Sequence, residues 1–420
     1  MGIGANTACC VRRYLGKALI CTLTITLPFL AEEVTAGVGI DLPPPDQVVL
    51  EAIAALPVNH GKNLGTARVL GPFNEIAQRF NLHKTGPQLR DYSLKMVWAP
   101  ERRRALYAGA NHGSPHRLND VWEFDLAAMA WILLYPPDNP RGYLDLGADH
   151  SDVIFRDGVL VTKRGAPAVV GHTWSGITYD PIGRKMLFMS TWPTNQDKAV
   201  TALGGDPGVR YRGPPLWAFD PESLTWTAIK TPKPYPAAPY GAMLEYVPEL
   251  RGAIWHMNNW RMQATWLYNP AAMRWTNLRA NGKREEFAKQ APARELVGYH
   301  DSARKIVIAR QGAITYHFDT KTLAWSKRGE DEEVPRGYDG HNVFYHDPVS
   351  GHGLLIDLPS GSLWSYDPDS SRWKRLIPDG DPMPTGKKIL AYVDAERNVL
   401  VVINDVHVWV FRYAAKSRSL

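Results

Sequence analysis

The chain has 420 residues, of which 48 are Lys or Arg, 42 are Asp or Glu, and 45% are hydrophobic. This composition is typical of a globular protein with a large core, and it excludes collagen, coiled coils and wholesale disorder. All three cysteines lie in the first 21 residues. If that stretch is removed, disulfide scaffolds, thiolate zinc sites and cysteine nucleophiles are excluded as well.

The N-terminus has the layout of a secretory signal peptide. Three basic residues between positions 12 and 17 precede an apolar run of 13 residues, Ala18–Leu30. Such a run spans roughly 20 Å as a helix, less than the ~30 Å hydrocarbon core, so a permanent anchor is the less favoured alternative. We expect residues 1–36 to be a signal peptide, the protein to be periplasmic or secreted, and no membrane contact after cleavage.

The segment 37–92 precedes a series of repeats and is expected to complete the last of them. That last repeat supplies three strands before the chain reaches Ala414, which would leave an open sheet edge with unpaired backbone groups. We therefore expect a strand around Thr66 to Phe73 to pair at this edge. The alternative is a loose proline-rich leader with a short helix near Gln47 to Ala55.

Residues 93–413 carry an aromatic hairpin motif six times. The copies are Val121–Asp125, Leu216–Asp220, Thr265–Asn269, Thr315–Asp319, Leu363–Asp367 and Val408–Arg412. From the second copy onward the central aromatic recurs at intervals of 49, 50, 48 and 45 residues, while the first gap of 95 residues is about two periods long. Five copies have a second tryptophan nine residues later, at Trp131, Trp226, Trp275, Trp325 and Trp373. With another strand pair upstream of each hairpin, this is the four-strand unit of a propeller blade.

The motif resembles the kelch repeat of galactose-oxidase-like β-propellers. It departs from that family because the usual Gly-Gly doublet after the second strand is absent; Ala108–Ala110, Asn258–Asn259 and Gln311–Gly312 stand there instead. The resemblance implies an all-β fold: a six-bladed kelch-type β-propeller with four-stranded antiparallel blades. We expect its last blade to be closed by an N-terminal strand.

The extra length in the first gap falls on one face of such a propeller. With strands labelled a to d outward from the channel, the b–c loops and d–a connections emerge on the same rim. The excess lies in a d–a connection, Asp138–Gly171, and a b–c loop, Pro193–Pro214. Long loops on a rigid scaffold usually carry function or are disordered, and the strand-like run Val159–Lys163 favours order.

The same rim is predicted to collect side chains suited to chemistry. The catalytic candidates are His112, His172 and Tyr211. The substrate-binding candidates are Asn111, Arg117, Trp174, Trp192, Arg210, Arg212, Asn259, Trp260, Arg261 and His341, and we place His256 and Arg310 on this rim as well. Each has a structural alternative as a loop cap, a hydrogen-bonded channel residue or a solvated loop charge. The repeated tryptophans Trp122, Trp217 and Trp364 are expected to pack between blades.

Copper-radical oxidation is excluded, because the galactose-oxidase resemblance would require a tyrosine crosslinked to cysteine and a histidine from an additional domain. We expect no cofactor and no bound metal, although His112, His172 and His341 are a conceivable metal set. Elimination from a uronate fits the rim better: it needs a carboxylate-neutralising cation, a base and an acid at the leaving oxygen. Bacterial ulvan lyases, exported propellers that use His, Tyr and Arg, are similar in inventory.

The favoured function is therefore a polysaccharide lyase that cleaves an acidic, uronate-containing glycan by β-elimination. His112 and His172 would be base and acid, Tyr211 an alternative acid, and Arg210 with Arg212, or Arg261, the carboxylate binders. Whether the protein is an enzyme stays open. The alternatives are a non-catalytic glycan- or protein-binding propeller and a sugar mutarotase or epimerase. We expect an acidic poly- or oligosaccharide partner, no nucleic acid, and a monomer.

Overall fold

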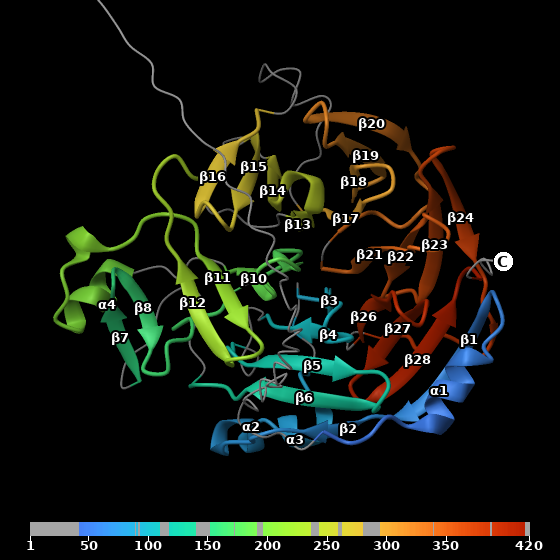
Figure 1. The fold of residues 1–420 in the computed structure, drawn as a ribbon, viewed down its shortest axis with the longest axis horizontal. Helices are drawn as coiled ribbons and strands as arrows, with labels where there is room; N and C mark the ends of the chain where they lie inside the picture. The colour runs from blue at the N-terminus through green and yellow to red at the C-terminus, as the bar shows by residue number, and fades with distance from the viewer. Residues whose placement is uncertain are drawn as a thin grey trace, which may run out of the picture. The chain divides into compact units, whose positions relative to one another are not determined.

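The computed structural model describes residues 42–88, 90, 93–109, 117–139, 152–171, 173–190, 196–236, 243–258, 263–279, 295–338, 340–386 and 389–415. Six sheets in this part of the chain form the blades of a six-bladed β-propeller (Figure 1). Within these ranges, no helix combines the length and apolar character needed to cross a membrane.

Each blade has four antiparallel strands. Blades 1 to 3 contain β3 (Val97–Ala99), β4 (Arg104–Tyr107), β5 (Val121–Asp125) and β6 (Ala130–Tyr135); β9 (Ile177–Asp180), β10 (Lys185–Met189), β11 (Leu216–Asp220) and β12 (Thr225–Ile229); and β13 (Met243–Val247), β14 (Gly252–Asn258), β15 (Gln263–Asn269) and β16 (Arg274–Asn277). Blades 4 and 5 contain β17 (Val297–Asp301), β18 (Ile306–Gln311), β19 (Ile314–Asp319) and β20 (Ala324–Glu330); and β21 (Asn342–His346), β22 (Gly353–Asp357), β23 (Ser362–Asp367) and β24 (Arg372–Leu376). Blade 6 contains β26 (Ile389–Asp394), β27 (Val399–Asn404), β28 (His407–Arg412) and β1 (His60–Thr66).

The blades close into a complete ring. The innermost strands contact one another in the order β3, β9, β13, β17, β21 and β26, and β26 contacts β3 again. A short 3₁₀ helix, η2 (Pro248–Leu250), forms the a–b turn of blade 3. Because consecutive strands are antiparallel, the b–c loops and d–a connections share one rim, as the sequence predicts.

An N-terminal strand closes blade 6, but not the predicted one. β1 pairs antiparallel with β28, from His60 opposite Arg412 to Thr66 opposite His407. The predicted segment, Thr66–Phe73, is therefore wrong: the short strand inside it, β2 (Arg68–Leu70), runs parallel to β6 as a fifth strand of blade 1. The sequence of β1, HGKNLGT, has no apolar alternation, so its periodicity could not reveal it.

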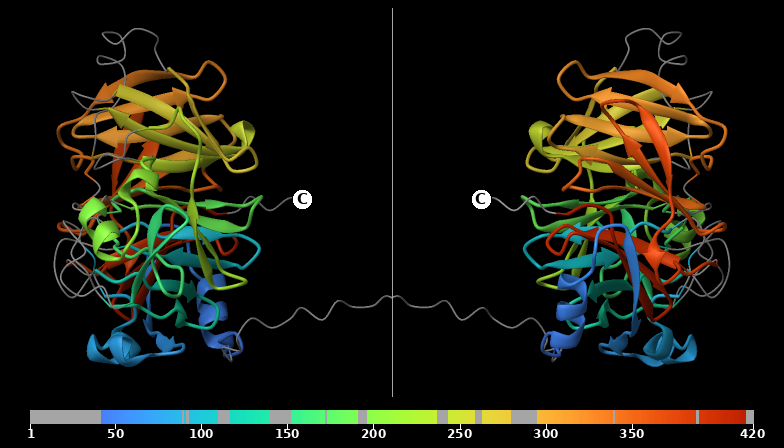
Figure 2. Two further views of the ribbon diagram at one scale, coloured as in Figure 1. Left: turned by 90° about the vertical axis from the view of Figure 1, so that its left-hand side faces the viewer. Right: turned by 90° about the vertical axis from the view of Figure 1, so that its right-hand side faces the viewer.

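The rest of the N-terminal segment lies along the outer edges of blades 6 and 1 (Figures 1 and 2). Helix α1 (Gln47–Ala54) begins where the side chain of Asp46 accepts hydrogen bonds from the amides of Val48 and Val49, a normal N-cap. The expected short helix is thus present together with the closing strand. It is followed by α2 (Glu75–Arg79) and α3 (Leu82–Thr85), while β25 (Asp379–Gly380) adds a parallel strand beside β1.

The nine-residue tryptophan spacing is a hairpin register. In blade 1, Phe124 lies directly opposite Trp131, and the same aromatic pair recurs in blades 2 to 5. The second tryptophan also links neighbouring blades: Trp325 Nε1 of blade 4 donates to Thr265 Oγ1 of blade 3 (2.9 Å). The hairpin of blade 4 therefore supplies both the core of its own blade and a hydrogen bond to the preceding blade, and Trp373 of blade 5 does the same through Thr315 Oγ1 of blade 4 (3.0 Å).

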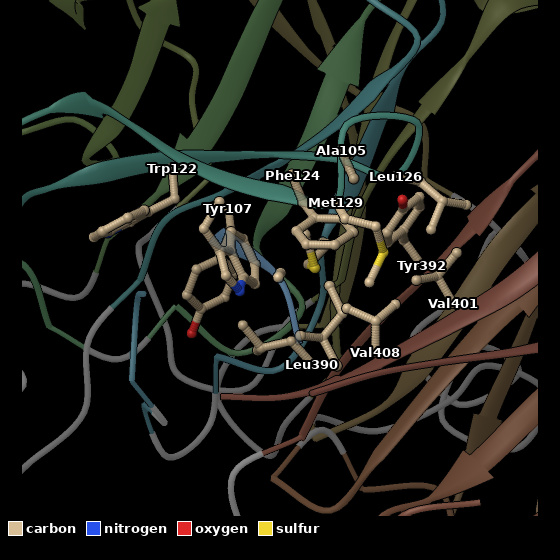
Figure 3. Close-up of a cluster of buried hydrophobic side chains, with 14 of the residues drawn as sticks. Ala105, Tyr107, Trp122, Phe124, Leu126, Met129, Leu390, Tyr392, Val401 and Val408 are labelled. Carbon is tan, nitrogen blue, oxygen red and sulfur yellow. The ribbon is translucent and has the colours of Figure 1, made fainter. Parts of the chain in front are cut away.

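The core between blades 1 and 6 illustrates this packing (Figure 3). Trp122 and Phe124 of blade 1 are fully buried and belong to one cluster with Leu390, Tyr392 and Val408 of blade 6. Burial of a large apolar side chain contributes about 1.5–3 kcal/mol relative to exposure. Trp122 is thus a packing residue, as its place in the repeat predicts.

The two long insertions form a packed body beside blade 2 (Figure 1). The described part of the first contains the hairpin β7 (Val153–Arg156) and β8 (Val159–Thr162), and the second contains α4 (Gln196–Ala202) and the 3₁₀ helix η1 (Pro207–Val209). They share an apolar cluster that includes Val153, Leu160 and Val200. The expected order in the first insertion is confirmed for these described residues.

Candidate functional site

The predicted site residues divide between described and undescribed positions. Seven lie outside the described residues: Asn111, His112, His172, Trp192, Asn259, Trp260 and Arg261. The other six are described, namely Arg117, Trp174, Arg210, Tyr211, Arg212 and His341. They do not gather in one place: three belong to the insertion beside blade 2, and His341 lies between blades 4 and 5.

Arg210 and Arg212 are engaged with one carboxylate of helix α4. Arg210 Nε donates to Asp197 Oδ1 (2.6 Å), and Arg212 Nη1 donates to Asp197 Oδ2 (3.0 Å). These hydrogen bonds hold the pKa of Asp197 below its usual value. The two guanidiniums therefore fasten the loop to α4, and their charge is directed at a side chain of the same insertion rather than at a ligand.

Tyr211 links the two insertions to the outer strand of blade 2. Its amide donates to the Gly158 carbonyl (2.8 Å), and its hydroxyl accepts from the Thr231 amide (3.2 Å). Burial raises the pKa of Tyr211 above its usual value. The ring lines a small pocket of about 60 Å³ beside Leu160 and Trp217, which has room for a few water molecules but not for a sugar ring.

Trp174 and Arg117 lie nearer to the inner strands. Trp174 precedes β9 in a left-handed backbone conformation (φ 49°), and its side chain is buried, with 8% exposed. An indole so enclosed has no open face for stacking in this conformation. Arg117 is half-buried in the b–c loop between β4 and β5.

His341 borders an open groove between blades 4 and 5, on the b–c and d–a rim. The groove has a volume of about 640 Å³ and is lined by Glu332, Glu333, Val334, Pro335, Arg336, Tyr338, His341, Asp357, Ser360, Ser362, Trp364 and Arg375. We call it the His341 groove. The exposed imidazole packs edge-on to the Tyr338 ring, with centroids 4.9 Å apart, and the His341 carbonyl accepts from the Leu358 amide (3.0 Å).

A hydrogen-bond network fixes the floor of the His341 groove. Asn342 Nδ2 donates to Asp357 Oδ1 (2.7 Å), and Asn342 Oδ1 accepts from the Tyr338 amide (2.8 Å). The Ser360 amide and hydroxyl donate to Asp357 Oδ2. The connection before blade 5 is therefore tied to the b–c turn of the same blade, so the two walls of the groove are held together.

Trp364 shows that a repeat tryptophan can also face a groove. It packs against the apolar cluster between blades 4 and 5, as predicted, but it is only half-buried and also lines the His341 groove. Its Nε1 donates to Ser362 Oγ (3.3 Å). From the sequence we expect Trp364 to pack between blades and nothing more. The repeat motif does not show at which gap between blades such a tryptophan also borders a groove.

Two residues placed on the rim by the sequence are structural. Arg310 is fully buried and donates to the carbonyls of Ala313, Asp331, Val334 and Pro335 at 2.8–3.0 Å. His256 is also fully buried, and its Nδ1 lies 2.9 Å from Thr265 Oγ1, the acceptor of the indole hydrogen bond from the next blade. Neither side chain reaches the surface.

A buried ion pair inside the ring has no counterpart among the sequence predictions. Lys95, which precedes β3, forms an ion pair with Glu245 of β13 and donates to the Leu244 carbonyl (3.3 Å). Blades 1 and 3 are not neighbours, so this contact spans the interior of the ring. Burial raises the pKa of Glu245 against the opposing effect of Lys95. The Tyr345 hydroxyl makes a second cross-ring contact, because it accepts from the Met96 amide (3.0 Å).

Within the described ranges, no group of three or more His, Cys, Asp or Glu side chains is arranged to hold a metal ion. The conceivable metal set is not tested by this, because two of its three histidines lie outside those ranges.

Comparison with known proteins adds little to this picture. No family model matches the chain, and no curated protein matches it. Among solved structures, the chain is similar to one in a crystal structure of a nidogen/laminin complex, with 11% identity, 70% of this chain and 91% of that chain covered, and a TM-score of 0.36. Such a likeness carries no argument about function. The class of the protein, a six-bladed β-propeller, rests on the blades described above.

Proposed function

We propose that the protein is an exported kelch-type propeller that binds carbohydrate in the His341 groove. The carrying observation is the composition of this groove: three ring-bearing side chains, Tyr338, His341 and Trp364, share one open hollow with serine, carboxylate and guanidinium groups. Sugars present apolar C–H faces that pack on rings, and hydroxyls that need donors and acceptors. A concave site with a few fixed polar groups suits such a ligand.

The described groove supports binding better than a reaction. Asp357 is held by Asn342 and Ser360, and Glu332 is paired with Arg336 (2.9 Å). A general base or nucleophile needs an accessible group with an activating neighbour. The fixed carboxylates serve instead as hydrogen-bond acceptors and as supports for the groove walls.

The test is titration calorimetry of the purified protein against a panel of soluble oligosaccharides. Replacement of both rings in the double variant Tyr338→Ala/His341→Ala is expected to weaken binding at least tenfold while the melting temperature stays within about 3 °C of wild type. Lys321→Ala, an exposed position on the c–d turn of blade 4, is the matched control and should bind as wild type. If wild type and the double variant bind a sugar with equal affinity, the His341 groove is not the binding site. If the protein binds no glycan of the panel, the proposal is refuted.

Polysaccharide lyase activity on a uronate-containing glycan is the second candidate. It is supported by the packed body that the two insertions build beside blade 2; its proposed base and acid, His112 and His172, lie outside the described residues. Incubation with acidic polysaccharides, followed by absorbance near the unsaturated-uronate band, tests it directly. A rise in absorbance that disappears in His112→Ala and His172→Ala establishes the lyase; no rise on any uronate polymer leaves the binding proposal alone. A sugar mutarotase would show neither a rise nor product formation, but faster equilibration of anomers.

A further inference from the structure

We infer that the His341 groove selects neutral, hydroxyl-rich sugars over uronates. This rests on the proposed function and names the ligand class of the same groove. It differs from the acidic glycan expected from the sequence. The carboxylate binders of that expectation are Arg210 with Arg212, or Arg261: the structure pairs Arg210 and Arg212 with Asp197, and Arg261 lies outside the described residues.

The first support is the balance of charge. The described residues that line the groove include three carboxylates, Glu332, Glu333 and Asp357, and two guanidiniums, Arg336 and Arg375. Negative charge is therefore in excess by one. A uronate brings one further negative charge per sugar unit into a hollow that already repels it, and like charges brought together at an interface disfavour the wrong partner.

The second support is how these charges are partnered. Glu332 and Arg336 neutralise each other, and Asp357 is held by neutral donors. Among the described residues, neither the Glu333 carboxylate nor the Arg375 guanidinium has a hydrogen-bond or ion-pair partner. The groove thus offers a ligand one acceptor of full negative charge and one donor of full positive charge. Hydroxyls can bond to both groups, whereas a uronate carboxylate can bond only to the guanidinium and is repelled by Glu333.

The third support is the acceptor capacity of the floor. Asp357 Oδ1 accepts a single bond, from Asn342, and a carboxylate oxygen can accept two. A hydroxyl can donate to the remaining lone pair, whereas a carboxylate has no proton to give. The rings that line the groove can pack on the C–H groups of a neutral hexose or pentose, while Asp357 on the floor accepts a hydrogen bond from one of its hydroxyls.

The experiment compares neutral oligosaccharides with uronate oligosaccharides of the same length and linkage, such as β-1,4-glucan against β-1,4-glucuronan fragments, by calorimetry at 20 and 150 mM NaCl. We expect the neutral ligand to bind about tenfold more tightly at low salt and the preference to shrink as salt screens the repulsion. Glu333→Gln should reduce the preference several-fold. Glu51→Gln, an exposed charge removal on α1, is the matched control and should leave it unchanged.

The outcomes separate the two levels of inference. Uronates that bind as tightly as their neutral counterparts, or more tightly, overturn the selectivity and leave the groove as a sugar site. An unchanged preference in Glu333→Gln overturns the electrostatic reason for it. Binding of neither class overturns the proposed function and this inference with it.

Discussion

Acidification should destabilise the fold through one buried histidine of blade 4. His317 is 4% exposed, and its Nε2 lies 2.9 Å from the Tyr366 hydroxyl of blade 5. Burial lowers the pKa of His317 to about 4. Because the folded state disfavours the charged ring, the unfolded chain binds more protons between pH 6.5 and 4. Stability is therefore complete above pH 6.5, falls as the pH drops through that value, and stops falling near pH 4.

The size of the effect follows from the two pKa values. Because the pKa of His317 is about 4 in the folded state and 6.5 in the unfolded chain, its titration lowers the free energy of unfolding by about 3 kcal/mol between neutral pH and pH values below 4. About 2.5 kcal/mol of this decrease has occurred by pH 4.5. Other groups also titrate over this range, so the quantity to measure is a difference between wild type and His317→Gln, in which an uncharged amide replaces the imidazole.

The assay is urea unfolding at pH 7.0, 6.0, 5.0 and 4.5. We expect the free energy of unfolding of wild type relative to His317→Gln to fall by about 2.5 kcal/mol from pH 7.0 to 4.5. Tyr366→Phe removes the hydroxyl but keeps a buried imidazole, so it should retain most of the pH dependence. Parallel curves for wild type and His317→Gln over this range would refute the reasoning.

Three further sets of substitutions test the backbone contact, the ion pair and the buried hydrogen bonds of the described fold. Gly61→Ala should lower the stability of the fold by about 1–3 kcal/mol in thermal melts, because an added Cβ overlaps the indole of Trp409 on the neighbouring strand. Its control is Gly329→Ala: a Cβ at Gly329 has room, so the stability of this variant should stay within about 0.5 kcal/mol of wild type. Lys95→Met and Glu245→Leu should each cost about 3 kcal/mol, and the double variant less than their sum; strict additivity in this cycle would contradict a direct buried pair. Arg310→Met should cost about 3 kcal/mol or more by leaving buried carbonyls unpaired, and a change below about 1 kcal/mol would show that water replaces the guanidinium.

The blades could be predicted from the sequence because each is a local pattern. Phe124 and Trp131 face each other across one tight turn, and the same short-range geometry recurs around the ring. The closing strand could not be placed in this way. Its residues, His60–Thr66, are polar and glycine-rich, so their identity as a strand depends on pairing with β28 at the other end of the chain.

The candidate site was less predictable because partners decide what a side chain does. Nothing near Arg210 in the motif indicates that Asp197, on a helix 13 residues earlier, accepts its hydrogen bond. Lys95 and Glu245 are 150 residues apart and meet only when the ring is complete. His341 could be selected from the rim argument, but the groove beside it required the position of Trp364 and of the turn that carries Asp357.

The double contribution of the N-terminal segment has a consequence for biogenesis. β1 completes blade 6 while β2, two residues later, extends blade 1, so a single stretch of chain spans the seam between the first and last blades. Arg412 also bonds to the carbonyl of Ile53, 359 residues away. β1, although synthesised early, must wait for β28, so this side of the seam forms late and slowly, whereas β2 can pair with β6 as soon as blade 1 is made. A chain truncated before β28 would leave β1 without this partner.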